Sequence, residues 1–94
     1  MGNHGDYVFI ITTANGSVPL SGANARIKWN GGEKMLISGT DGRTRFSFEF
    51  PNDVLSFITA EIYVNAEGFY PVHVDKVMIY KNITTVRIIN LNRI

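Results

Sequence analysis

Residues 39–50 constrain the fold most, because a turn signal leads directly into a strand with two different faces. The pair Asp41-Gly42 suits a tight hairpin turn, since glycine adopts positive φ without steric cost. Beyond the turn, aromatic side chains alternate with polar ones, in the order Arg45, Phe46, Ser47, Phe48, Glu49 and Phe50. Side chains of a strand point alternately to its two faces, so the rings enter one apolar layer while the polar set meets water. The segment therefore predicts a strand with a single buried face.

Alternating or β-branched segments recur along the chain, separated by turn signals about every 8–12 residues. We expect seven strands, at residues 6–13, 23–30, 33–38, 43–50, 57–65, 69–79 and 83–92. No window shows the helical period of about 3.6 residues, so little or no helix is expected. These features predict an all-β sandwich in a single domain, residues 6–94. Residues 1–5 are polar and glycine-rich, and we expect them to form a flexible N-terminal arm.

Three further predictions concern the faces and edges of these strands. The apolar register slips by one residue after Val74, so Asp75-Lys76 should form a bulge or a turn. In the last strand, Val86 and Ile88 should face the core. At most two strands should remain as sheet edges, with Lys and Arg side chains on their outer positions.

Length and composition argue against several classes of function. A chain of 94 residues with an apolar fraction of 45% fits one core of ordinary size. The net charge of +1 and the scattered basic residues give no basic face for a nucleic acid. The chain has no cysteine, which excludes disulfides and thiolate chemistry. No apolar run approaches the roughly 20 residues of a membrane helix, and the first residues lack a signal-peptide pattern, so neither membrane insertion nor a particular compartment is predicted.

Four groups of turn and core residues occur in a recognisable order. They are Pro19-Leu20-Ser21-Gly22-Ala23 with Ile27, Thr40-Asp41-Gly42-Arg43-Thr44 with Phe46, Ala66-Glu67-Gly68-Phe69-Tyr70-Pro71, and Asn82-Ile83-Thr84-Thr85-Val86 with Ile88 and Leu91. Their order, over residues 7–92, resembles that of carboxypeptidase regulatory-like domains, which share the transthyretin-like (prealbumin-like) fold. The resemblance implies a seven-stranded antiparallel Greek-key β-sandwich. It also implies a non-catalytic module, because most such domains are attached to surface proteins, peptidases or cell-wall enzymes.

Two relatives of that fold carry chemistry, and this chain departs from both. The transthyretin-related hydrolases use clustered His and Arg side chains, whereas the histidines here are only His4, in the arm, and His73. Collagen-adhesin domains form an isopeptide bond between a first-strand lysine and a last-strand asparagine, helped by a buried acid. Asn90 and Glu61 could be offered for two of these roles, but residues 6–13 contain no lysine. Neither chemistry is therefore expected.

The remaining ionisable residues predict no catalytic, cofactor or metal site. His73 has only Asp75 as an obvious neighbouring ligand, and a metal ion needs two or three more. We expect Asp41 to have a structural role in its turn and not to bind calcium, because Thr-Asp-Gly lacks the oxygen ligands of a calcium loop. No serine has a neighbouring base in a recognisable frame, and Glu49, Glu61 and Glu67 show no acid–base signature. The chain is therefore not expected to be an enzyme.

The aromatic side chains leave two interpretations open. Phe57, Tyr63 and Phe69 lie opposite the main apolar faces of their strands, so they would form an exposed patch if no sheet covers them. The leading hypothesis is a structural or protein-interaction module, which self-associates or binds a protein partner in an extracellular, surface or phage-tail-like assembly. The alternative is a carbohydrate- or peptidoglycan-binding module of a bacterial cell-wall enzyme, with exposed rings in a row. The sequence does not specify which residues would bind.

Overall fold

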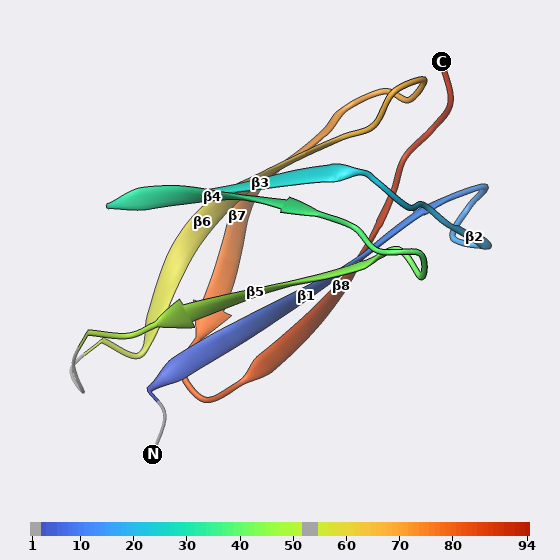
Figure 1. Ribbon diagram of the computed structural model, residues 1–94. Helices are drawn as coiled ribbons and strands as arrows, with labels where there is room; N and C mark the ends of the chain where they lie inside the picture. Colours follow the sequence, from blue (N-terminus) through green and yellow to red (C-terminus); the bar gives the residue numbers. More distant parts are fainter. Residues whose placement is uncertain (1–2, 52–54) are drawn as a thin grey trace.

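The computed structural model describes residues 3–51 and 55–94, and these residues form an all-β sandwich without helix (Figure 1). The first sheet contains β1 (His4–Thr13), β2 (Val18–Pro19), β5 (Arg43–Glu49) and β8 (Thr84–Asn90). The second sheet has the order β4-β3-β6-β7, formed by β3 (Asn24–Trp29), β4 (Gly32–Ile37), β6 (Phe57–Asn65) and β7 (Val72–Tyr80). The predicted all-β sandwich is confirmed. The described residues contain no helix that is long and apolar enough to span a membrane.

The described residues form eight strands where seven were expected. The additional strand is the two-residue β2, which pairs with the end of β1. Pro19 fits there although it has no N–H to donate, because β2 is short and lies at the edge of its sheet. The first strand also begins earlier than expected, since His4 and Gly5 pair with β5 instead of belonging to an arm. Residues 1 and 2 of the expected arm lie outside the described residues.

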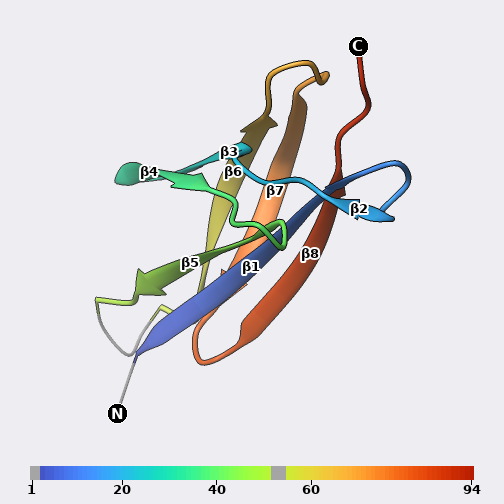
Figure 2. The ribbon, with the colours of Figure 1, turned by 45° about the vertical axis from the view of Figure 1, so that its right-hand side comes forward.

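β1 lies at the centre of the first sheet, between β5 and β8 (Figure 2). β5 runs antiparallel to β1, whereas β8 runs parallel to it. Every other strand pair of the described residues is antiparallel. β8 is parallel because the chain leaves the second sheet after β7 and crosses to the first, where it lies alongside β1.

The core lies between the two sheets and is formed by the apolar side chains that point inward from both. The largest fully buried side chains are Phe9, Phe46, Ile11, Ile27, Ile62, Ile79, Leu91, Val64 and Val77. At one end of the core, the Trp29 ring packs against Phe46, with 5.1 Å between centroids, and against Phe48, with 5.8 Å. The buried phenylalanine face predicted for β5 is therefore confirmed.

The irregularity predicted at Asp75-Lys76 is a β-bulge between β6 and β7. On β6 the single residue Glu61 lies between two regular pairs, while on β7 both Asp75 and Lys76 lie between the same pairs. The extra residue moves the following side chains to the other face, so Val77 and Ile79 return to the core.

Two predictions about the last strand and the sheet edges are wrong. Val86 and Ile88 point away from the core and are 58% and 64% exposed, whereas Ile89 is buried. The pairing with β1 explains this, because it places Val86 beside Val8 on the outer face of the first sheet. In addition, two open sheets leave the long strands β4, β5, β7 and β8 at their edges, besides the short β2, which is more than the two edge strands expected.

Candidate interaction surfaces

An apolar patch covers the outer face of the first sheet along β1 and β8. In the register of the two strands, Val8 lies beside Val86 and Ile10 lies beside Ile88. The two β8 side chains are more than half exposed, and the two β1 side chains are partly buried. We call these four residues the β8 patch. Contiguous aliphatic side chains on an open sheet face are typical of an interaction site.

The backbone of β8 has no strand partner on its outer edge among the described residues. At one end of the ladder, the Asp6 N–H donates to the Ile83 carbonyl oxygen, at 3.0 Å. In a parallel ladder with this register, every second residue of β8 bonds to β1, and the residues between direct their N–H and C=O groups outward. Val86 and Ile88 belong to the outward set. The exposed aliphatic side chains and the unpaired backbone groups therefore come from the same residues.

Among the edge strands longer than the two-residue β2, β8 is the least charged. Its only charged side chain is Arg87, which lies on the register opposite the patch. The other edge strands carry two or three charged side chains each, namely Glu33 and Lys34 on β4, Arg43, Arg45 and Glu49 on β5, and Asp75 and Lys76 on β7. Charges on an edge strand oppose pairing with another chain. β8 is thus the edge that is best suited to pairing.

β4 also exposes apolar side chains, but they form no continuous surface. Met35 and Ile37 are 55% and 65% exposed. Their neighbours on β3 are the polar residues Arg26 and Asn24. The neighbours of the exposed β8 residues, by contrast, are aliphatic, which distinguishes the two edges.

A buried carboxylate borders the β8 patch on β1. Asp6 is 9% exposed, and its carboxylate accepts hydrogen bonds from the Ser47 hydroxyl, at 2.5 Å, and from the Arg45 guanidinium, at 2.9 Å. The Ser47 hydrogen bond is the largest influence on the pKa of Asp6 and lowers it, burial opposes this, and Arg45 lowers the pKa further. The net effect is a lowered pKa, so the carboxylate stays ionised near neutral pH and ties β1 to β5.

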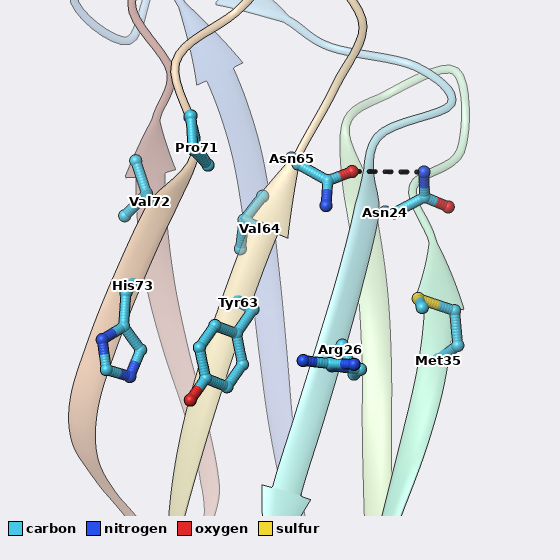
Figure 3. Close-up of a pocket in the computed structure, with 9 residues that line it drawn as sticks. All are labelled: Asn24, Arg26, Met35, Tyr63, Val64, Asn65, Pro71, Val72 and His73. Carbon is cyan, nitrogen blue, oxygen red and sulfur yellow. Dashed lines mark hydrogen bonds between the residues drawn. The ribbon is translucent and has the colours of Figure 1, made fainter.

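The outer face of the second sheet carries a row of four side chains, one from each strand: Met35, Arg26, Tyr63 and His73 (Figure 3). The His73 and Tyr63 rings stack with 4.4 Å between centroids and 7° between planes. On the other side of the Tyr63 ring, the Arg26 guanidinium carbon lies 5.0 Å from the centroid. The row lines a hollow of about 410 Å³. Because both sides of the Tyr63 ring are covered, this ring offers no free face for a sugar.

Two carboxylates lie next to this row, at the bulge. Glu61 Oε1 is 3.7 Å from His73 Nε2, and Glu61 Oε2 accepts a hydrogen bond from the Tyr63 hydroxyl, at 3.2 Å. The pKa of Tyr63 is raised, first by desolvation and then by the neighbouring Glu61 carboxylate. Asp75 completes the group on β7. The sequence indicated Asp75 as a neighbour of His73 but missed Glu61, because only the β6–β7 register brings Glu61 to that place.

The other polar candidates have structural roles. The Asp41 carboxylate accepts a hydrogen bond from the Arg43 N–H, at 3.1 Å, within the turn predicted for it. The Asn90 side-chain oxygen accepts hydrogen bonds from the Gly16 N–H, at 3.0 Å, and from the Thr12 hydroxyl, at 3.3 Å. Asn90 therefore anchors the turn after β1 to the end of β8.

The aromatic residues expected on the outer faces do not form a row. Phe57 is 42% exposed and lies against Tyr80, with 6.1 Å between ring centroids. Phe69 is partly buried against the core, and Tyr63 is covered as described above. The exposed Tyr70 lies near the turn between β6 and β7, at the end of these strands opposite to Phe57.

No protein-family model matches the sequence, and no curated protein matches it. Function is therefore inferred from the surfaces described above.

Proposed function

We propose that this chain is a non-catalytic protein-interaction module that assembles through the β8 patch and the free edge of β8. The observation that carries the proposal is the coincidence of exposed aliphatic side chains and unpaired backbone groups at Val86 and Ile88. Strand addition to a sheet edge uses both features, because the main chain supplies hydrogen bonds and alternate side chains supply apolar contact.

The partner that we propose is a second copy of the chain. A strand edge is self-complementary, so β8 of one copy can pair antiparallel with β8 of another and extend the first sheet through a twofold axis. The β8 patches of the two copies then lie on the same face and join into one apolar surface. The net charge of +1 opposes this association only weakly.

We further propose that the fold is the transthyretin-like Greek-key sandwich that the sequence motifs indicate. If the two-residue β2 is set aside, the described residues form seven strands. This number supports the assignment, because the transthyretin-like sandwich that the motifs indicate has seven strands. Self-association through a sheet edge suits a repeated subunit or an appended domain of an extracellular, surface or phage-tail-like assembly.

A carbohydrate- or peptidoglycan-binding role has less support. Sugar-binding surfaces present aromatic ring faces in the open, and here the exposed rings, Phe57 with Tyr80 and Tyr70, lie at opposite ends of the β6–β7 hairpin. The Tyr63 ring is covered on both sides, and the partly buried Trp29 ring packs against Phe46 and Phe48.

The proposal is tested by the mass of the particle in solution, measured by sedimentation velocity over a wide concentration range. We expect the wild-type chain to dimerise with rising concentration. Val86→Lys and Ile88→Lys place a charge on exposed positions of β8, so both variants should fold normally and remain monomeric.

Met35→Lys and Ile37→Lys are the matched controls, because they place the same charge on exposed apolar positions of the other edge strand, β4. These controls should dimerise like the wild type. A wild-type chain that stays monomeric at every concentration would refute the proposal. So would dimerisation that the β4 variants abolish and the β8 variants leave intact.

A further inference from the structure

We propose that Glu61, His73 and Asp75 form a binding site for a divalent transition-metal ion of the zinc type. The site lies on the outer face of the second sheet, whereas the β8 patch lies on the outer face of the first. It is therefore independent of the proposed assembly surface, and it adds a ligand that assembly does not require.

The geometry brings one donor atom from each residue to the same place. No two of the three donor atoms are more than 4.8 Å apart, and His73 Nε2 is 3.7 Å from Glu61 Oε1. Two atoms that bind one Zn²⁺ at roughly 2.0–2.2 Å lie at most about 4.4 Å apart. The histidine–glutamate pair is already within this limit. Asp75 is exposed, and the separation of at most 4.8 Å exceeds this limit by only about 0.4 Å, so a small side-chain movement would complete the set.

The donor types select the class of ion. One imidazole nitrogen with two carboxylate oxygens is a donor set that zinc and its neighbours in the first transition row accept. Ca²⁺ takes six to eight oxygen ligands and Mg²⁺ prefers oxygen in octahedral geometry, so both fit this set poorly. Three protein donors leave at least one coordination position of a Zn²⁺ ion for water or for a donor of another molecule.

The β-bulge and the neighbouring ring hold the donors in position. In the bulge, Glu61 alone opposes Asp75 and Lys76. This arrangement places the carboxylates of Glu61 and Asp75 side by side across β6 and β7. The Tyr63 ring stacks on His73 and fixes the plane of the imidazole. The Tyr63 hydroxyl donates to Glu61 Oε2 and leaves Oε1 directed to the site. Such outer partners orient ligands at metal sites.

The charges around the site favour a cation. Two carboxylates at this distance repel each other, and a bound cation relieves the repulsion. Lys28 opposes Glu61 in the β3–β6 register and lines a hollow with Glu61 and Asp75, but it forms no ion pair with either carboxylate. Among the ion pairs of residues 3–51 and 55–94, only His73 lies within 4 Å of either carboxylate. A divalent ion would bind both carboxylates and would tie β6 to β7 across the bulge.

The test is a titration of the full chain with Zn²⁺ at slightly alkaline pH, followed by calorimetry and by the NMR signals of the histidine rings. We expect one ion per chain, with the largest shifts at the His73 ring. His73→Gln, Glu61→Gln and Asp75→Asn should each weaken binding by at least about tenfold. Tyr63→Phe, which removes only the hydroxyl that orients Glu61, should weaken it by a smaller factor.

His4→Gln is the matched control, because His4 is the only other histidine and also lies near a carboxylate, with Nε2 3.7 Å from Asp6 Oδ2. This variant should bind Zn²⁺ as the wild type does. All three ligands are partly or largely exposed, so their variants should keep the wild-type circular dichroism spectrum. Absence of Zn²⁺ binding, binding that survives His73→Gln, or binding that His4→Gln abolishes would each overturn the proposal.

Discussion

Gly5 of β1 lies so close to Tyr80 of β7 that a Cβ atom on Gly5 would overlap the Tyr80 carbonyl oxygen. The two residues belong to different sheets, so this contact is a point where the backbones of both layers meet directly. A side chain would force the layers apart. Glycine is required at this position because of space, since no unusual φ is needed.

Gly5→Ala should therefore destabilise the sandwich. The added methyl group would also lie 3.1 Å from Ile79 Cγ2, inside the core, so relaxation on either side is restricted. We expect the free energy of unfolding to fall by about 1–3 kcal/mol. Urea denaturation, followed by the fluorescence of Trp29, measures it. Gly39→Ala is the control, because its new Cβ would meet atoms no closer than 3.5 Å and should change stability far less.

The Asp6 network predicts a dependence of stability on pH. The folded-state pKa of Asp6 is lowered, mainly by the Ser47 hydrogen bond, below the value of about 3.9 in the unfolded chain. Its contribution is therefore complete above about pH 4 and is lost as the pH falls through the folded-state pKa. Asp6→Asn should lower the free energy of unfolding by about 1–2 kcal/mol at pH 7.

This difference should shrink when wild type and variant are compared at a pH below the folded-state pKa of Asp6, where the wild-type carboxyl is itself protonated. Glu67→Gln removes the same charge from an exposed position and should leave stability nearly unchanged at both pH values. Equal stability of Asp6→Asn and wild type at neutral pH would show that the network contributes nothing.

Ser38 holds the segment before β3 to the end of β4. Its hydroxyl donates to the Leu20 carbonyl oxygen, at 2.6 Å, and accepts from the Ala23 N–H, at 3.0 Å, while the side chain is buried. Ser38→Ala leaves both backbone groups without this partner, so the free energy of unfolding should fall by about 1–3 kcal/mol. Thermal unfolding followed by circular dichroism checks this. Ser56→Ala, at an exposed position, should leave the transition unchanged.

Trp29 and Phe46 form the aromatic end of the core, with 5.1 Å between their rings. Phe46→Ala removes a ring that is 2% exposed and should lower the free energy of unfolding by about 3–5 kcal/mol. It should also shift the emission of Trp29, the only tryptophan, to longer wavelength in the folded state. Phe57→Ala serves as the comparison, since that ring is 42% exposed, and it should change both quantities little. An unshifted emission in Phe46→Ala would contradict the packing described here.

The sequence predicted the strand faces well wherever one register is apolar and the other polar. Phe46 on β5 and Ile62 on β6 are buried as expected because their neighbours along the strand are polar, and Phe50, directly after β5, is buried too. The bulge at Asp75-Lys76 was also predicted, since the alternation of apolar and polar residues shifts by one residue at that place.

The inward face of the last strand was harder to predict, because apolar residues occupy both of its registers. Val86 and Ile88 compete with Ile89 for the core, and only the parallel pairing with β1 decides between the two faces. Glu61 was missed for a related reason, since its nearness to His73 depends on the register between two strands. The turn at residues 66–71 contains a signal for that register, because a hairpin centred there places Tyr63 opposite His73.

The parallel pairing of β1 and β8 gives the domain a mechanical property. The chain enters and leaves at opposite ends of the sandwich (Figure 1). A pull on both termini therefore slides the two strands lengthwise past each other and strains all hydrogen bonds of their ladder simultaneously. In a hairpin the bonds would instead open one after another. The first and last strands thus form a clamp that resists stretching along their common direction.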